Sequence, residues 1–382
     1  MDLHEYQTKH LLNQYRIPIP FGEVVRNEDE AISAVTHLGG NSWVLKAQIH
    51  ASGRSQAGGI RIVANEEELC STIKQMIGSR LTTPFNAPEG QIVNQILIEK
   101  PIHIANELYI ALTIDNNIAN IKLSVSESNK LENKKSFEVS IRPLIGLQNY
   151  QCREIFSQLN LEPQHLLTFS SLLKNLYRLF VEKDLILLKI NPLAITPSGE
   201  FVCIDAKCSV DDAALFRQPE VRNMRDITQE SPRELRAEQC GLHFVQSNGE
   251  IGCMVNGTGL TLAIIDLLAN ESKKAACFLD LRGNINKQSV VEAFKIMLSD
   301  RQIKSILINI FAGSIDCNVI AEGIVAATAE LNFNLPIIVN LQGLNAKSAL
   351  TILKQNNLGI TIAKNITQAI QNAVSAINGE NK

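Results

Sequence analysis

The chain has 382 residues, of which 45% are hydrophobic and 20% are charged; this composition is typical of a globular protein and excludes a disordered, collagen-like or coiled-coil chain. Its 36 Lys and Arg residues and 39 Asp and Glu residues leave a formal net charge of −3, so bulk electrostatics disfavour nucleic acid or an anionic membrane as a partner. The polar start and the lack of an apolar run of membrane-spanning length predict an unsecreted protein of the cytoplasm, or of the mitochondrial matrix if it is organellar, although no transit peptide is seen.

The first part of the chain, to about residue 240, predicts an α+β region of two lobes, because its extended runs follow one another as hairpins. Residues 165–182 have the apolar periodicity of an amphipathic helix. The charged stretch 222–238 is typical of a polar helical connector, which puts a domain boundary near residue 238. The predicted strands are 43–49, 60–63, 92–99, 107–114 and 118–125, with a turn at Asn116-Asn117.

Beyond about residue 250, apolar runs alternate with helical segments. Runs without polar alternation, each followed by a helix, indicate a doubly wound parallel sheet, in which ligands meet the carboxyl ends of the strands. The runs are 251–255, 275–279, 303–310, 336–341 and 358–363, and the helical segments are 260–269, 287–299, 318–331, 345–356 and 367–377. The strands end at 256–259, 280–284, 311–316 and 342–345.

A lysine on the strand 43–49 precedes a loop of small residues at 51–59. Strand alternation puts Lys46 on one face with Val44 and Gln48, and the backbone N–H groups of such a loop can cover a polyphosphate. The Gly-x-x-x-x-Gly-Lys-Ser/Thr pattern of a P-loop does not occur. Taken alone, these residues also fit a half-exposed strand lysine beside a mobile loop.

A predicted hairpin brings an amide and a carboxylate together. A turn centred on Ser198 makes the numbers of paired residues add up to 396, so Asn191 faces Asp205 and Lys189 faces Lys207, all on one face. Amide and carboxylate oxygens suit Mg²⁺, which completes its shell with water and phosphates. The alternative is a polar hairpin end bonded to itself, although two opposed lysines favour an anion between them.

Two further acids lie at strand ends: Glu99 ends one predicted strand and Glu107 begins the next. Such acids either accept hydrogen bonds from a nucleoside or are simply solvated. The seven histidines form no His-x-x-x-His pair, and none lies beside a Ser or Cys nucleophile. A zinc enzyme or a self-contained hydrolase is therefore disfavoured.

Short motifs along the whole chain carry a family resemblance. They are Leu3-His4-Glu5-Tyr6-Gln7, Glu107-Leu108-Tyr109, Ile190-Asn191-Pro192-Leu193, Ala214-Leu215-Phe216-Arg217-Gln218-Pro219, Met224-Arg225-Asp226, Gly252-Cys253-Met254-Val255-Asn256-Gly257 and Ile308-Asn309-Ile310-Phe311. With these motifs the chain resembles the β subunit of succinyl-CoA synthetase (succinate–CoA ligase), from Met1 to about residue 378.

The resemblance implies an ATP-grasp nucleotide-binding region of two lobes over 1–238 and a flavodoxin-like CoA-ligase domain over 239–382. It implies that Asn191 and Asp205 hold Mg²⁺. The nucleotide contacts that it implies are Lys46, Gly53, Arg54, Ser55, Glu99, Ile102 and Glu107. The implied contacts to substrate or phosphate are Asn256, Gly313, Ser314 and Ile315.

The resemblance also implies a partner, an α subunit that binds CoA and carries a transiently phosphorylated histidine. The implied reaction is succinate + CoA + ATP (or GTP) = succinyl-CoA + ADP (or GDP) + phosphate, with Mg²⁺ as cofactor. Phosphoryl transfer depends mainly on positioning and charge neutralisation, which a lysine, a metal ion and loop amides supply.

Several positions depart from the family pattern. Lys189 stands where the family has a glutamate that receives the phosphohistidine, and Asp316 stands where the family has an arginine. The positions that lack a family glycine are Ser52, Ser55, Arg282, Asn284 and Ala312. We expect a working ligase subunit; the alternatives are an impaired or inactive paralogue that binds an α subunit or nucleotide, and a related acyl-CoA ligase for another acid.

Overall fold

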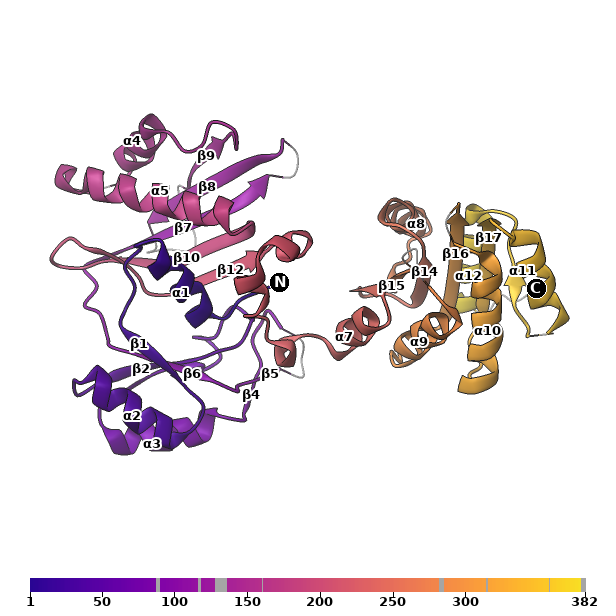
Figure 1. The fold of residues 1–382 in the computed structure, drawn as a ribbon, viewed down its shortest axis with the longest axis horizontal. Helices are drawn as coiled ribbons and strands as arrows, with labels where there is room; N and C mark the ends of the chain where they lie inside the picture. The colour runs from indigo at the N-terminus through magenta and orange to yellow at the C-terminus, as the bar shows by residue number, and fades with distance from the viewer. Residues whose placement is uncertain are drawn as a thin grey trace. The chain divides into compact units, whose positions relative to one another are not determined.

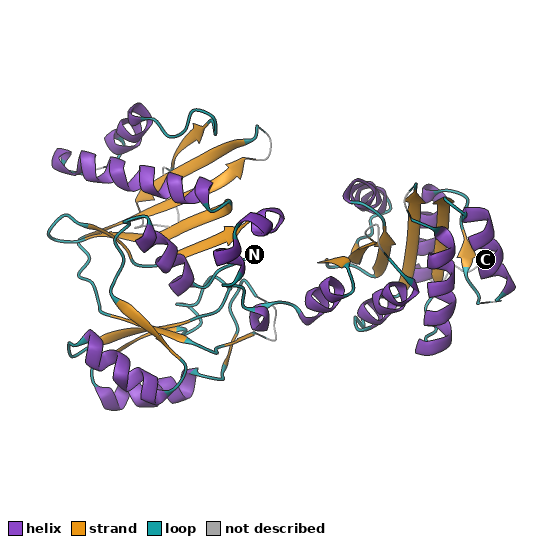
Figure 2. Cartoon of the chain, viewed as in Figure 1, coloured by secondary structure: helices purple, strands orange, loops and turns teal. Residues whose placement is uncertain are grey.

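The computed structural model describes residues 1–86, 90–115, 118–127, 136–159, 161–281, 285–313, 315–356 and 358–378. They form two compact units, Met1–Gln229 and Glu230–Lys382 (Figures 1 and 2). Each unit has its own hydrophobic cores. The predicted turn at Asn116-Asn117 and the predicted loop positions Arg282, Asn284 and Ser314 lie outside the described residues.

Lobe 1 of the Met1–Gln229 unit is an antiparallel sheet covered by two helices. Its elements are β1 (Gly22–Val25), α2 (Glu28–Leu38), β2 (Trp43–Ala47), β3 (Ile60–Val63), α3 (Glu66–Met76) and β6 (Ile96–Glu99), with β4 (Arg80–Leu81) and β5 (Gln91–Ile92) as a separate ribbon. The strand order is β1-β6-β2-β3, and Figure 1 shows α2 and α3 along the same side of the sheet. Asn27 and Asn65 begin these helices, because each side chain accepts a hydrogen bond from a backbone N–H of the first turn.

Lobe 2 is a larger antiparallel sheet with three helices. Its elements are α1 (Glu5–Gln14), β7 (Asn106–Asp115), β8 (Asn120–Glu127), β9 (Phe137–Ile141), α4 (Asn149–Ser157), α5 (Leu166–Glu182), β10 (Leu185–Ile195), β11 (Phe201–Cys203) and β12 (Ala206–Val210). The strand order is β11-β10-β7-β8-β9, and β12 also pairs with β10. Although α1 precedes lobe 1 in the chain, Leu11 and Leu12 of α1 are buried in the core of lobe 2.

The predicted hairpin register is confirmed. Residue numbers add up to 396 both where Lys189 pairs with Lys207 and where Leu193 pairs with Cys203. The returning strand is broken between β11 and β12, where the N–H of Asn191 donates to the carbonyl of Asp205 at 3.0 Å. This break turns the carbonyl of Ile204 towards two lysine side chains.

The Glu230–Lys382 unit is a doubly wound sheet with one antiparallel edge strand. Its elements are α7 (Pro232–Gln239), β13 (Leu242–Gln246), β14 (Ile251–Val255), α8 (Thr258–Asn270), β15 (Ala275–Leu281), α9 (Lys287–Leu298), β16 (Ser305–Ala312), α10 (Cys317–Leu331), β17 (Ile337–Gly343), α11 (Ala346–Gln355), β18 (Thr361–Ile362) and α12 (Ile366–Asn378). The strand order is β13-β15-β14-β16-β17-β18. Residues of α9, α10 and α11 share one core and residues of α8 and α12 another, so helices cover both faces.

The predicted doubly wound sheet is confirmed, but two features differ from expectation. The edge strand β13 runs antiparallel to β15 and was not predicted, because its buried and exposed residues alternate and it lacks a continuous apolar run. The helix α7 belongs to the second unit, since Ala237 is buried in that unit's core, whereas the sequence placed a boundary near residue 238.

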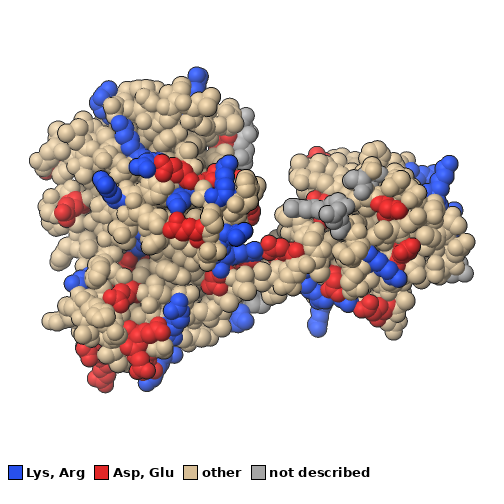
Figure 3. Space-filling view, viewed as in Figure 1, with Lys and Arg blue, Asp and Glu red and all other residues tan. Residues whose placement is uncertain are grey.

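The charge on the surface and the apolar character of the helices relate to the predictions about nucleic-acid and membrane partners. Figure 3 shows acidic and basic side chains interspersed on the face that it draws of each unit. None of the described helices combines the length and the apolar character needed to cross a membrane.

Candidate functional site

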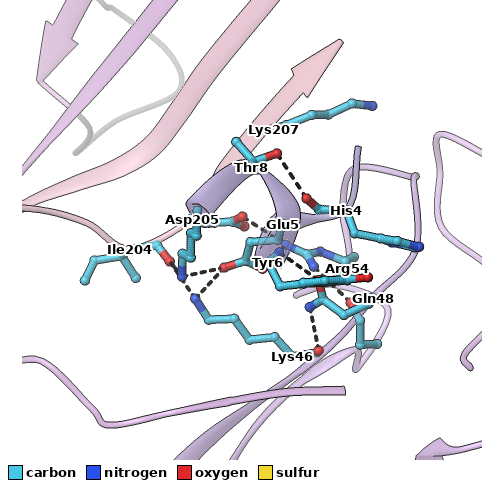
Figure 4. Close-up of polar contacts among 12 residues, drawn as sticks. His4, Glu5, Tyr6, Thr8, Lys46, Gln48, Arg54, Ile204, Asp205 and Lys207 are labelled. Atoms are coloured by element: carbon cyan, nitrogen blue, oxygen red, sulfur yellow. Dashed lines mark hydrogen bonds and ion pairs between the residues drawn. The ribbon is translucent and has the colours of Figure 1, made fainter. Parts of the chain in front are cut away.

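Charged side chains gather between the two lobes of the Met1–Gln229 unit (Figure 4). This interlobe cluster consists of Glu5, Lys9 and Asp205 from lobe 2 and Lys46, Arg54 and Glu99 from lobe 1. The side chain of Asp205 is 31% exposed, and all the others are buried. Glu5 and Lys9 are four residues apart on α1, which places them on one face of the helix.

Lys46 points from β2 into the middle of the cluster. Its Nζ lies 2.9 Å from Oε1 of Glu5, 2.7 Å from Oε2 of Glu99 and 2.6 Å from the carbonyl oxygen of Ile204. An ammonium has three donors, and each of them has an acceptor here. Because only 3% of this side chain is exposed, the alternative of a half-exposed strand lysine is wrong.

Lys9 approaches the same acceptors from α1. Its Nζ lies 2.8 Å from Oε1 of Glu5, forms an ion pair with Oε1 of Glu99, and donates to the carbonyl of Ile204 at 2.7 Å. Two ammonium groups therefore share one pair of carboxylates and one carbonyl.

Arg54, in the loop after β2, reaches both lobes. Its Nη2 lies 2.6 Å from Oε2 of Glu5 and 2.9 Å from Oδ1 of Asp205, while Nη1 donates to the carbonyl of Ala47 at 2.9 Å. The preceding Gly53 has a φ of +80°, and a Cβ there would lie 3.0 Å from the ring of Phe85. Glycine is therefore favoured at this turn, which aims Arg54 inward.

Burial and opposite charge act against each other in the cluster. Burial alone would raise the pKa of Glu5, but Lys9, Lys46 and Arg54 outweigh burial and hold the pKa below its usual value. Burial alone would lower the pKa of Lys46, yet Glu5, Glu99 and Asp205 together raise it. For Asp205, burial and the nearby Glu5 carboxylate raise the pKa despite the neighbouring cations. Glu5 and Lys46 are therefore charged at neutral pH.

Asn191 and Asp205 fit a divalent cation that needs few protein ligands. The backbone N–H of Asn191 donates to the carbonyl of Asp205, so the two residues are neighbours across the hairpin, and Arg54 of the cluster contacts Oδ1 of Asp205. Among the described residues there is no group of three or more His, Cys, Asp or Glu side chains that could hold a metal. Such a pair suits Mg²⁺, which keeps waters and phosphate oxygens in its shell.

Other predicted residues are not joined to the interlobe cluster. No hydrogen bond or ion pair in the described part of the chain links Ile102 or Glu107 to it, and Ser55 is exposed. The Nζ of Lys189 lies 5.3 Å from the centre of the Tyr109 ring, a favourable cation–π distance.

Lys207, the residue paired with Lys189, has protein partners of its own. It donates to the carbonyl of His50 at 3.0 Å and lies 3.3 Å from Oδ2 of Asp2. The predicted anion between the two lysines is therefore not needed to explain their pairing.

In the Glu230–Lys382 unit, the predicted contacts lie at the carboxyl ends of the strands. The side chain of Asn256 accepts from the N–H of Phe311 at 2.8 Å and donates to its carbonyl at 2.9 Å, which ties the end of β14 to β16. Gly313 follows β16 and Ile315 is 3% exposed. Of these predicted contacts, Ser314 alone lies outside the described residues.

Asp316 has a structural role that its sequence position did not predict. Its Oδ1 accepts from the N–H of Asn318 at 2.9 Å, which caps α10, and its Oδ2 accepts from the amide of Asn345 at 3.0 Å. An arginine at this position could not accept either bond.

A hollow of about 200 Å³ also lies at this end of the sheet. It is lined by Leu260, Asn309, Phe311, Asn340, Gln342, Asn365 and Ile366. Inside it, the amide of Asn340 donates to Oδ1 of Asn309 at 2.7 Å, and both residues are buried.

Sequence reasoning missed Glu5 and Lys9 as members of the site. The available signal was the motif Leu3-His4-Glu5-Tyr6-Gln7, which carried the resemblance but received no role. A charged residue beside the start of a polar helix is usually solvated, so only the fold shows that α1 buries these two charges.

A two-lobed antiparallel unit followed by a doubly wound unit is the architecture of ligases that join an ATP-grasp region to a CoA-ligase domain. Family models for both parts match the chain, "ATP-grasp domain" over residues 2–195 and "CoA-ligase" over residues 254–374. The succinate–CoA ligase (ADP-forming) subunit beta of Coxiella burnetii is 45% identical over 386 residues, which cover 99% of each chain. The subunits of that name from Histophilus somni and Klebsiella pneumoniae are 41% and 40% identical, covering at least 98% of each chain.

The chain therefore belongs to the succinate–CoA ligase β-subunit family. A solved structure of ATP citrate lyase from Methanothrix soehngenii, in complex with citrate and coenzyme A, matches with a TM-score of 0.72 at 19% identity over 98% of this chain and 99% of that one. At that identity the match shows a common fold.

Proposed function

We propose that the chain is the nucleotide-binding β subunit of a cytoplasmic succinate–CoA ligase, which uses ATP, or GTP, to drive formation of succinyl-CoA from succinate and CoA. The observation that carries the proposal is the interlobe cluster. It brings together Lys46, Arg54, Glu99 and Asp205, which the family resemblance had assigned to nucleotide and metal from four separate segments. The names of the relatives, all ADP-forming, favour ATP.

The chemistry asked of this site is positioning and charge neutralisation. Lys46 and Arg54 would bind the phosphates between the lobes, and Asn191 with Asp205 would hold Mg²⁺. When bound, Mg²⁺ would supply positive charge to the phosphate oxygens. Glu99, at the end of β6, would hold Lys46 in place.

The second half of the reaction requires a partner chain. We propose that an α subunit supplies the CoA site and the phosphorylated histidine. Asn256, Gly313, Ser314 and Ile315 would then contact phosphate or succinate from the β side. Because both polar groups of the Asn256 side chain already bond to Phe311, that residue would mainly hold the loop that receives the substrate.

Co-expression with the cognate α subunit tests the proposal. The purified complex is assayed for CoA thioester formation that depends on succinate, Mg²⁺ and either ATP or GTP. We expect succinyl-CoA synthesis that the Lys46→Met variant loses. A folded complex that binds neither nucleotide, or forms the thioester with another acid and not with succinate, overturns the assignment.

Lys189 favours a second candidate, a β subunit of reduced activity. It replaces a family glutamate, and it lies against the ring of Tyr109, with no ion pair to a carboxylate among the described residues. A cation there would repel a protonated imidazole and retain a phosphorylated one. The complex with the α subunit distinguishes the two candidates. A β subunit of reduced activity assembles with the α subunit and binds ATP, but the complex turns over slowly.

A further inference from the structure

The contacts of Lys46 leave its ammonium no N–H for a phosphate. Its three acceptors are the carboxylates of Glu5 and Glu99 and the carbonyl of Ile204, all within 2.9 Å, and an ammonium has three N–H groups. A phosphate that binds Lys46 must therefore displace one of them. The carbonyl is fixed by the backbone, so a carboxylate is the group that has to give way.

Glu5 is the carboxylate that holds both phosphate-binding cations. One oxygen accepts from Lys46 and the other from Arg54, whereas Glu99 contacts Lys46 but has no ion pair with Arg54. Glu5 comes from α1 in lobe 2 and the two cations come from lobe 1, so these ion pairs also join the lobes.

Lys9 is placed to remain behind when the cations move. It contacts both Glu5 and Glu99, and it lies on the same helix face as Glu5, four residues away. A carboxylate that stays buried without a cation is strongly destabilised. Lys9 prevents this, because it keeps both carboxylates paired after Lys46 and Arg54 have turned to another anion.

We propose that Glu5 is a positioning residue that competes with the nucleotide: its carboxylate holds Lys46 and Arg54 across the lobes, nucleotide phosphates take these cations from it, and Lys9 keeps Glu5 paired during the exchange. The inference rests on the proposed nucleotide site and adds a role for two residues of α1. It makes the strength of nucleotide binding depend on an exchange of anions around Lys46.

The exchange predicts opposite effects from two substitutions on the same helix. In Glu5→Gln the competing charge is lost, and we expect the dissociation constant for MgATP to fall by about tenfold, which corresponds to about 1.4 kcal/mol. In Lys9→Met the remaining counter-ion is lost, so Glu5 and Glu99 retain Lys46 more strongly, and we expect the constant to rise by about tenfold. Both variants should unfold at a lower temperature, because each removes one ion-pair partner from the remaining buried charges.

The measurement is calorimetric titration of MgATP into the full-length chain and into its complex with the α subunit, with thermal unfolding of each variant alongside. Glu220→Gln is the matched control, because it removes a carboxylate paired with Lys183 at 3.0 Å outside the cluster, and it should leave the dissociation constant unchanged. If Glu5→Gln is folded and binds MgATP as weakly as wild type or more weakly, the competition is refuted. The same holds if Lys9→Met binds as tightly as wild type.

The double variant and Lys46→Met separate the inference from the proposed function. In Glu5→Gln/Lys9→Met both charges are absent, so the dissociation constant should return towards the wild-type value. If instead the two single substitutions change the dissociation constant in the same direction, Glu5 and Lys9 act only by stabilising α1. If wild type binds no MgATP, or Lys46→Met binds it as well as wild type, the proposed nucleotide site fails. If Lys46→Met loses binding and Glu5→Gln does not tighten it, only the inference fails.

Discussion

Replacement of Lys46 by methionine tests whether the interlobe cluster holds the two lobes together. Methionine keeps a side chain of similar length but removes the ammonium between Glu5 and Glu99. Lys9 and Arg54 then have to neutralise these carboxylates. Removal of one partner from a buried ion pair destabilises a protein by about 3–5 kcal/mol when the other charge is left without a partner. Because Lys9 still pairs with both carboxylates, we expect a loss at the lower end of this range, about 3 kcal/mol, for the Met1–Gln229 unit.

The single tryptophan makes this loss measurable in one unit of the chain. Trp43 is buried in β2, three positions before Lys46, so its fluorescence reports the unfolding of lobe 1. With a urea dependence of about 2–3 kcal/mol per molar, the expected loss moves the unfolding midpoint down by roughly 1–2 M. The deficit should shrink at acidic pH, because Lys46 helps to hold the pKa of Glu5 below its usual value, so Glu5 takes up its proton at a higher pH in the variant than in wild type.

The control is Lys74→Met on α3, where an exposed lysine pairs with Glu28 at 2.9 Å. It removes the same charge from the same lobe and should leave the midpoint nearly unchanged. A Lys46→Met midpoint within error of wild type at pH 7 would refute the view that buried ion pairs hold the lobes. A deficit that does not change with pH would refute it too, since the reasoning depends on the charge of Glu5.

Three further expectations follow from the structure. Lys189→Glu, which restores the family's glutamate, should raise succinyl-CoA synthesis severalfold in the complex with the α subunit, and a lower rate than wild type would contradict the idea of an impaired site. Burial and the nearby His4 lower the pKa of His50 to about 4, below its value of 6.5 in the unfolded chain, so the unfolded state binds the proton first and stability falls as the pH drops from about 6.5 to about 4. The Trp43 urea midpoint should fall less between pH 7 and pH 5 in His50→Gln than in wild type, and equal falls would argue against His50. Asp316→Ala removes the cap of α10 and should destabilise the Glu230–Lys382 unit by about 0.5–2 kcal/mol, seen as an earlier thermal transition by circular dichroism, whereas an unchanged transition would show that the cap is dispensable.

The sequence predicted best those elements whose burial is continuous. Residues 251–255 coincide with β14, because a strand covered on both faces is apolar throughout. The predicted helix 287–299 differs from α9 by one residue. The register between β10 and β12 was also predictable, since a tight turn fixes the pairing of both flanking strands.

The residues that the sequence did not assign belong to α1. Glu5, Gln7, Thr8 and Lys9 are buried on this helix, yet none of them is apolar, so apolar periodicity does not detect the buried face. Their burial depends on charges that arrive from β2, β6 and the loop after β2, far along the chain. Local patterns carry no information on such pairings, which only the packing of the two lobes creates.

The amide pair of Asn309 and Asn340 has a consequence for how the second sheet assembles. These two residues face each other across β16 and β17, within runs of isoleucine, leucine and valine that would pack almost equally well after a shift along the strand. A shift would separate the two amides and leave each one buried without its partner, at a cost of about 1–3 kcal/mol per group. The pair thus marks the correct alignment of two otherwise interchangeable strands and penalises every misaligned one during folding.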